Sequence, residues 1–189
     1  MSGTTIPSND HMARSIGGTG QILAGLGILV ALGLWLVLMG RDAVCACGEV
    51  RFWQNTPTSA DNSQQFSDWY SLLHGVFGMA LFLAIARIKP LWSTGTRLVA
   101  AMGGSAVWEA VENMPPVIAL FHAGPDSYAG DSLLNAFGDM VFVIIGFGLA
   151  ARLPLWATAI LAISAEFIVS LAMHDGLILG TLRLLGAPV

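Results

Sequence analysis

Residues 21–40 read QILAGLGILVALGLWLVLMG and contain no charged side chain. A helix of about twenty apolar residues spans the roughly 30 Å hydrocarbon core of a bilayer. A secretory signal peptide would have a shorter apolar core followed by a small-residue cleavage site, and the next residues, RDAVCACG, offer no clean site. The stretch therefore predicts a retained transmembrane helix, and it decides the fold class.

Four more apolar segments follow this first one, at residues 69–88, 97–113, 131–151 and 154–173. The chain is 55% hydrophobic and only 11% charged, and its mean hydropathy is +0.71. A soluble domain has about a quarter of its residues charged. Helices are expected because an open strand cannot satisfy its backbone polar groups in lipid. The sequence predicts an all-α, polytopic membrane bundle of about five transmembrane helices.

The remaining segments are assigned by their length and polarity. Residues 1–20 are rich in Gly, Ser and Thr and predict a flexible tail, so that residues 21–189 form one membrane-embedded domain. At residues 114–124, MPPVIALFHAG, two prolines end the third helix, and VIALF is too short to span. We expect a short re-entrant or interfacial piece there, and a surface or bundle-packed helix at residues 176–189.

The eight basic residues predict the orientation of the bundle. With the N-terminus in the cytoplasm, five of them lie on the cytoplasmic side and three lie outside, and the most compact group is ARIKPLWSTGTR at residues 86–97. This bias predicts a bacterial inner-membrane protein with a cytoplasmic N-terminus. The long connection at residues 41–68 is then extracytoplasmic.

Both cysteines of the chain, Cys45 and Cys47, lie in this predicted extracytoplasmic loop. In an oxidising compartment they could pair, although a bridge between residues two apart closes a small and strained ring. A CxC pair can also bind a soft metal ion, but the chain has no second cysteine pair to complete a tetrahedral site. Ordinary thiols near a membrane surface are the third alternative.

Polar side chains gather in the predicted outer halves of the spans. Intramembrane ionisable groups are costly, so they usually face the bundle interior or a water-filled cavity. The sequence thus predicts a buried acidic pocket that opens to the extracytoplasmic side. Its candidate members are His74, Glu109, Glu112, Asn113, Asp131, Asn135, Asp139 and Glu166.

The chemistry of these residue types indicates two uses. A histidine with several carboxylates can hold a divalent metal ion such as Zn²⁺, and carboxyl groups with separated pKa values can act as acid and base. Catalytic candidates are His74, Glu109, Glu112, Asp139 and Glu166, and metal-ligand candidates are His74, Glu109, Asp131, Asp139 and Glu166. In the alternative interpretation, Glu109, Glu112 and Asp131 are solvated at the headgroup level. His122 and Asp126 are loop residues that could cap the pocket or face water.

Several separated motifs resemble those of one protein family. They are MGRDAVCACGEVRFW at residues 39–53, DNSQQFSDWYSLLHG at 61–75, VWEAVEN at 107–113, and YAGDSLLNAFGDMVFVIIGFGLAARLPLW at 128–156. The chain resembles the uncharacterised multi-pass membrane proteins called domain of unknown function 2585, found mainly in alphaproteobacteria. The resemblance covers about residues 39–175 and implies an inner-membrane protein. It supplies no activity, substrate or catalytic residue.

Three classes of function are compatible with the sequence. An accessory or structural membrane protein, with the polar residues as ties between helices, is the first expectation. The first alternative is a membrane-embedded enzyme, with or without a metal ion, that acts on a lipid or envelope substrate, and the second is a proton-coupled carrier. The apolar inner halves of the spans argue against a carrier path. The bilayer and a possible membrane-protein partner are the expected contacts, and the net charge of −4 argues against nucleic acid.

Overall fold

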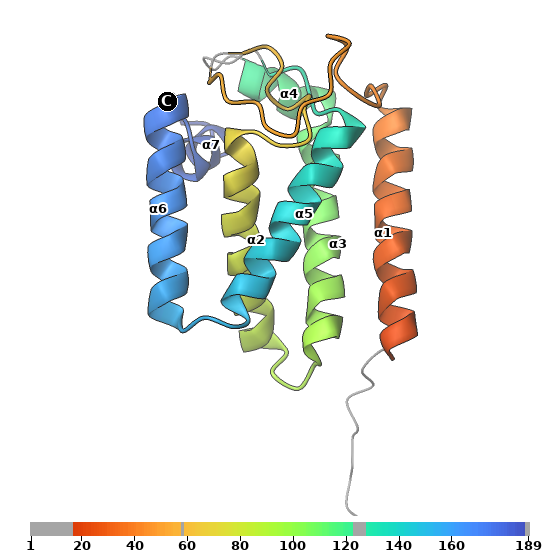
Figure 1. Cartoon of the computed structure of the whole chain (residues 1–189), viewed down its shortest axis with the longest axis vertical. Coiled ribbons are helices and arrows are strands. Elements are labelled where there is room, and N and C mark those ends of the chain that lie inside the picture. Colours follow the sequence, from red (N-terminus) through yellow and green to blue (C-terminus); the bar gives the residue numbers. More distant parts are fainter. Residues whose placement is uncertain (1–16, 58, 123–127, 188–189) are drawn as a thin grey trace, which may run out of the picture.

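A computed structural model of the chain describes residues 17–57, 59–122 and 128–187, and the regular structure in these residues is entirely α-helical. Five long helices run side by side as a bundle (Figure 1). They are α1 (Gly18–Leu38), α2 (Trp69–Ile88), α3 (Thr94–Glu112), α5 (Leu133–Ala150) and α6 (Leu155–Met173), and two short helices are α4 (Pro115–His122) and α7 (Leu177–Leu184). The predicted all-helical class is confirmed.

The number of spans that composition identifies is smaller than predicted. Within the described residues, four helices, α1, α2, α5 and α6, are long and apolar enough to cross a membrane. Helix α3 has a similar length, 19 residues, and lies within the same bundle (Figure 1), but it carries Arg97, Glu109 and Glu112. Its polarity has a structural reason, because α3 buries Glu109 completely against its neighbours.

The two ends of the bundle differ in structure. Residues 39–68, α4 and α7 lie at one end, which we call the loop end, and the short connections at residues 89–93 and 151–154 lie at the other (Figure 1). The segment predicted to be re-entrant or interfacial is α4, which begins at the proline pair and contacts α7. Of the predicted tail, residues 1–16 lie outside the described residues, and α1 begins at Gly18.

Helices α2 and α5 form the closest pair in the bundle. Gly146 lies against the carbonyl oxygen of Gly75, and Gly78 lies against the backbone of Val143, so that a Cβ atom at Gly146 or Gly78 would overlap a neighbouring main chain. Small residues at such contacts allow membrane helices to approach closely. This approach brings His74 of α2 into the layer that α3 and α5 share.

The loop at residues 39–68 is attached to the start of α5 through backbone groups. The first N–H groups of a helix have no partner within the helix itself. Here the N–H groups of Ser132, Leu133 and Leu134 donate to the carbonyl oxygens of Ser63, Asp42 and Ala43, at 2.9, 2.9 and 3.1 Å. The side chain of Asn135 adds a bond from Nδ2 to the carbonyl oxygen of Gln65, at 2.9 Å. The predicted site residue Asn135 is therefore an anchor for this loop.

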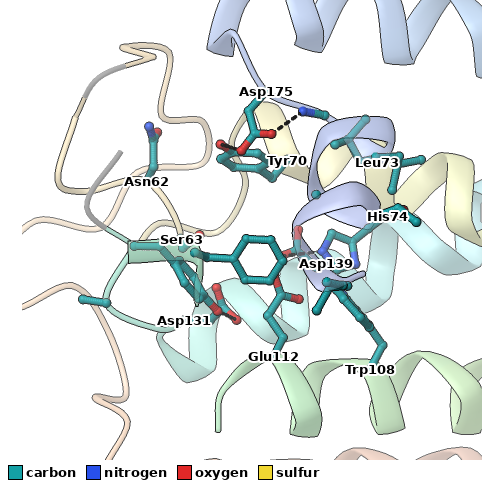
Figure 2. A pocket seen from close by; sticks show the side chains of 18 of the residues that line it. Asn62, Ser63, Tyr70, Leu73, His74, Trp108, Glu112, Asp131, Asp139 and Asp175 are labelled. Carbon is teal, nitrogen blue, oxygen red and sulfur yellow. Dashed lines mark hydrogen bonds and ion pairs between the residues drawn. The ribbon is translucent and has the colours of Figure 1, made fainter. Parts of the chain in front are cut away.

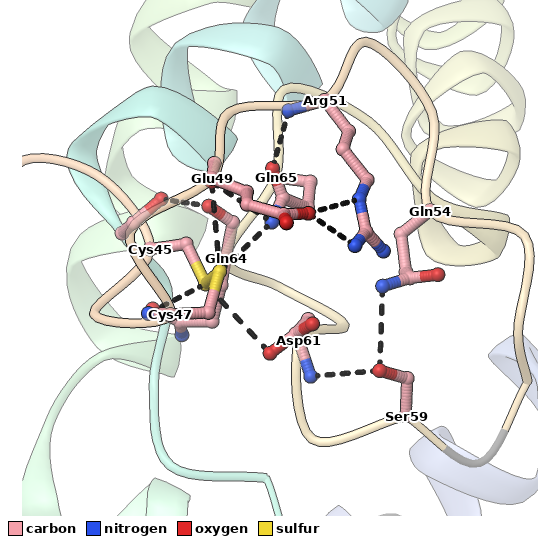
Figure 3. Close-up of a disulfide and its surroundings, with 10 residues drawn as sticks. Cys45, Cys47, Glu49, Arg51, Gln54, Ser59, Asp61, Gln64 and Gln65 are labelled. Carbon is pink, nitrogen blue, oxygen red and sulfur yellow. Dashed lines mark hydrogen bonds and ion pairs between the residues drawn. A yellow bond between two sulfur atoms is a disulfide. The ribbon is translucent and has the colours of Figure 1, made fainter.

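A disulfide joins Cys45 and Cys47 within the same loop, with their Cα atoms 5.1 Å apart (Figure 3). The sequence leaves three alternatives for this cysteine pair: a disulfide, a soft-metal site or ordinary thiols. The structure contains the disulfide. The amide Nε2 of the buried Gln65 lies 3.4 Å from Cys47 Sγ and 3.3 Å from the carbonyl oxygen of Glu49, and Gln65 Oε1 accepts from the N–H of Arg51 at 2.6 Å. Gln65 thus holds the disulfide turn against the rest of the loop.

Candidate functional site

Three titratable side chains from three helices meet near the loop end of the bundle. His74 Nδ1 of α2 lies 3.2 Å from Glu109 Oε1 of α3, and His74 Nε2 lies 3.7 Å from Asp139 Oδ2 of α5. The exposed fractions of the three side chains are 11% for His74, 0% for Glu109 and 5% for Asp139. One ligand atom from each residue lies within 4.8 Å of the others, which is a spacing that could hold a metal ion.

A second group adjoins the first and shares Glu109 with it. Glu109, Glu112 and Asp131 each offer a carboxylate oxygen, and these oxygens also lie within 4.8 Å of one another. Glu109 and Glu112 stand one turn apart on α3, whereas Asp131 comes from the segment before α5. The two groups together form a buried cluster of one histidine and four carboxyl groups, which we call the acidic cluster.

Asn113 and Tyr128 hold Asp131 in place. Asn113 Nδ2 donates to Asp131 Oδ2 at 2.6 Å, the N–H of Asp131 donates to Asn113 Oδ1 at 2.8 Å, and the Tyr128 hydroxyl donates to Asp131 Oδ2 at 2.9 Å. Burial raises the pKa of Asp131 to about 6, and the two side-chain bonds oppose that rise. Burial and the neighbouring Asp131 charge raise the pKa of Tyr128 well above its ordinary value, so its hydroxyl stays protonated and can donate.

Several polar atoms of the acidic cluster are buried without a hydrogen-bond partner among the described residues. They include His74 Nδ1, both carboxylate oxygens of Glu109, Glu112 Oε2 and Asp139 Oδ1. The 3.2 Å approach of His74 Nδ1 to Glu109 does not have the alignment of a hydrogen bond, so it counts as proximity only. Most buried polar atoms in folded proteins are hydrogen-bonded. These unpartnered ligand-type atoms make the acidic cluster the candidate functional site of the described residues.

The acidic cluster borders a cavity of about 160 Å³ at the loop end (Figure 2). His74, Glu112, Asp131 and Asp139 line the cavity, and Figure 2 shows Glu112, Asp131 and Asp139 gathered around it. The remaining wall is largely apolar and aromatic, although it includes polar side chains such as Asn62, Gln64 and Thr181, and it comes from the loop before α2, from α2, α3, α4 and α7, and from the segment before α5. Its larger side chains are Tyr70, Leu73, Trp108, Phe121, Tyr128, Leu177 and Leu184. A polar end and an apolar wall suit an amphipathic ligand.

The structure brings together six of the predicted site residues, namely His74, Glu109, Glu112, Asn113, Asp131 and Asp139. Glu166 does not join them. Its carboxylate accepts from the N–H groups of Leu177 and Ile178, at 3.1 and 3.2 Å, and so caps the start of α7. Asp126 and the side chain of His122 lie outside the described residues.

Sequence reasoning missed several polar residues at the cavity, among them Tyr128 and Asp175. Tyr128 donates to Asp131, and Asp175 pairs with Arg183 at 2.6 Å, from Asp175 Oδ2 to Arg183 Nη1. The spacing of Tyr128 and Asp131, three residues apart in a segment without Lys or Arg, is a signal that could have indicated the first of them. The Asp175–Arg183 pair depends on the fold-back of α7, which no local pattern indicates.

Comparison with known proteins gives consistent matches over most of the chain. The family model described as "Protein of unknown function (DUF2585)" matches residues 36–189. A "UPF0314 protein" of Paracoccus denitrificans is 38% identical over 160 residues, covering 84% of this chain and 83% of that protein. A "UPF0314 protein" of Sphingopyxis alaskensis is 36% identical over 180 residues, covering 94% and 95%. No solved structure matches significantly.

Proposed function

The chain belongs to the DUF2585 family, and from that premise and the geometry of the acidic cluster we propose that it is a membrane-embedded, metal-dependent enzyme. The observation that carries this proposal is the meeting of His74, Glu109 and Asp139 from three separate helices, with their ligand atoms within 4.8 Å. Imidazole nitrogens and carboxylate oxygens are both ligands that bind Zn²⁺ and related divalent ions in catalytic sites.

The unpartnered oxygens favour an enzyme over an accessory protein. A polar network that only ties helices together gains its stability from hydrogen bonds between its members. In the acidic cluster, both oxygens of Glu109 and one oxygen of Asp139 are buried without such bonds. A divalent ion would bind these oxygens and offset the repulsion between the two carboxylates.

The cavity suggests the class of substrate. Its wall combines the carboxylates with Leu73, Trp108 and Phe121, so a ligand with a polar group and an apolar part would find both of its halves matched. We therefore place a lipid or lipid-linked envelope molecule in the cavity, with its polar group at the ion. A divalent ion at the cluster would supply an activated water for hydrolysis of that group.

The proposed location follows from the same features. The four apolar helices support a membrane location, and the distribution of basic residues favours an inner membrane with a cytoplasmic N-terminus. In that orientation the loop end, with the acidic cluster and the Cys45–Cys47 disulfide, is extracytoplasmic. A disulfide is compatible with an oxidising compartment outside the cytoplasm.

The test measures bound metal ions and activity on the same preparations. Protein purified in detergent is stripped with chelator, dialysed against Zn²⁺ or Mn²⁺ and analysed for its metal content. We expect a bound ion in the wild type, strongly weakened binding in His74→Ala and Asp139→Asn, and unchanged binding in the control Glu49→Gln, whose carboxylate pairs with Arg51 on the exposed loop. The metal-loaded wild type, compared with Asp139→Asn, is then incubated with an inner-membrane lipid extract, and the products are identified by mass spectrometry.

Two results would overturn this proposal. The first is a folded wild type that retains no divalent ion above the level of the chelated control. The second is ion binding that His74→Ala and Asp139→Asn leave unchanged, because the ion would then lie elsewhere.

A further inference from the structure

We propose that the acidic cluster binds a second divalent cation, held by Glu109, Glu112 and Asp131, next to the ion at His74, Glu109 and Asp139. The proposal rests on the function proposed above and extends it from one ion to a two-ion centre. Such a centre would let the enzyme bind both the attacking and the departing oxygen of its substrate, as two-metal sites do.

The geometry offers the second ion three carboxylate ligands. Glu109, Glu112 and Asp131 offer ligand oxygens within 4.8 Å of one another, in the same range as the first group. Glu109 belongs to both groups and has two oxygens, of which Oε1 is the one that lies 3.2 Å from His74 Nδ1. A bridging carboxylate with one oxygen for each ion is a common way in which paired metal ions share a ligand.

The charges of the acidic cluster favour two ions over one. Its four carboxylates carry a charge of −4 when ionised, so one divalent ion leaves −2 and two divalent ions leave zero. Two described arginines at the loop end make other contacts, since Arg183 pairs with Asp175 and Arg41 donates to the carbonyl oxygen of Ala129. Charge left uncompensated in a buried site is costly, so these carboxyl groups must either bind protons or be neutralised by a second divalent ion.

The second observation is that several carboxylate oxygens of the acidic cluster lack hydrogen-bond partners among the described residues. Both oxygens of Glu109 and Glu112 Oε2 are buried without a hydrogen-bond partner among the described residues, and the Glu109 side chain has an exposed fraction of 0%. Asp131, by contrast, is already oriented by Asn113 and Tyr128. The site therefore combines one pre-positioned ligand with free carboxylate oxygens, an arrangement that metal sites use to fix their geometry.

The closing experiment counts Mn²⁺ ions and tests whether they are neighbours. Equilibrium dialysis with Mn²⁺ followed by elemental analysis gives the number bound per chain, and electron paramagnetic resonance separates an exchange-coupled pair from isolated ions. We expect two coupled Mn²⁺ in the wild type, and one isolated Mn²⁺ in Glu112→Gln and in Asp131→Asn. The control Glu49→Gln should keep the coupled pair.

The outcomes separate this inference from the proposed function. A folded wild type with one isolated Mn²⁺ overturns the second site and leaves the first in place, whereas a wild type with none overturns the proposed function as well. Two coupled ions retained in Glu112→Gln and Asp131→Asn would also overturn the second site. Because either variant could fail to fold, circular dichroism and gel filtration accompany each count, and the wild-type count is decisive by itself.

Discussion

Replacing Asn113 by Ala should be among the most damaging single truncations at the loop end. Asn113 is completely buried and its amide makes three bonds: Nδ2 donates to Asp131 Oδ2 at 2.6 Å and to the carbonyl oxygen of Glu109 at 3.0 Å, and Oδ1 accepts from the N–H of Asp131 at 2.8 Å. A bond to a charged group contributes about 1.5–3 kcal/mol, and a buried N–H left without a partner costs about 1–3 kcal/mol. We expect Asn113→Ala to lower the free energy of unfolding by about 3–5 kcal/mol.

Asn135→Ala is the matched control for this change. Asn135 is an equally buried asparagine with an exposed fraction of 1%, so both truncations leave a similar cavity. Its side-chain Nδ2 donates one bond, to the neutral carbonyl oxygen of Gln65 at 2.9 Å, and the expected loss is about 1–2 kcal/mol. The free energies would be measured by SDS titration in mixed micelles with a circular-dichroism readout. If Asn113→Ala costs no more than Asn135→Ala, Asn113 does not hold the acidic cluster together.

Three further predictions concern the packing, the end of α6 and the loop. Gly146→Ala should destabilise the bundle by about 3 kcal/mol, because its Cβ would overlap the main chain of α2, while Gly27→Ala, with open space around it, should leave stability unchanged in the same titration. Glu166→Ala should speed hydrogen exchange at the first amides of α7 and leave the bound metal ions in place; loss of the ions would contradict the separate roles assigned here. In the purified protein, Cys45 and Cys47 should resist alkylation before reduction and take up two labels after it, as mass spectrometry would show.

The apolar runs predicted the fold well because span length is a property of composition alone. The second predicted span, residues 69–88, has the same limits as α2, and the third, residues 97–113, differs from α3 by three residues at its start and one at its end. The start differs because Ser93 caps α3 by accepting a hydrogen bond from the N–H of Thr96, which places the helix start before the first apolar run. A hydropathy pattern carries no information about such a capping bond, so it could not predict where α3 begins.

The candidate site was less predictable, since a periodic pattern fixes which residues share a helix face but not what that face meets. Asp131, Asn135 and Asp139 recur every four residues, yet Asp131 and Asp139 join the acidic cluster while Asn135 bonds to the loop. Glu166 is predicted at a depth similar to that of Asp139, but its carboxylate accepts a hydrogen bond from the N–H of Leu177 at the start of α7. Where α7 folds back depends on tertiary contacts, and these cannot be read from one segment at a time.

The backbone bonds between the loop and the start of α5 have a consequence for biosynthesis. Asp42 and Ala43 leave the ribosome some ninety residues before Leu133 and Leu134. Their carbonyl oxygens accept hydrogen bonds from the N–H groups of those two residues. The carbonyl groups of the loop therefore remain hydrogen-bonded to water until the fourth long helix, α5, has been made. Maturation of the loop end is consequently a late event, and a chain that ended before α5 would contain the first three long helices but lack Asp139 and the residues of α7 that complete the cavity.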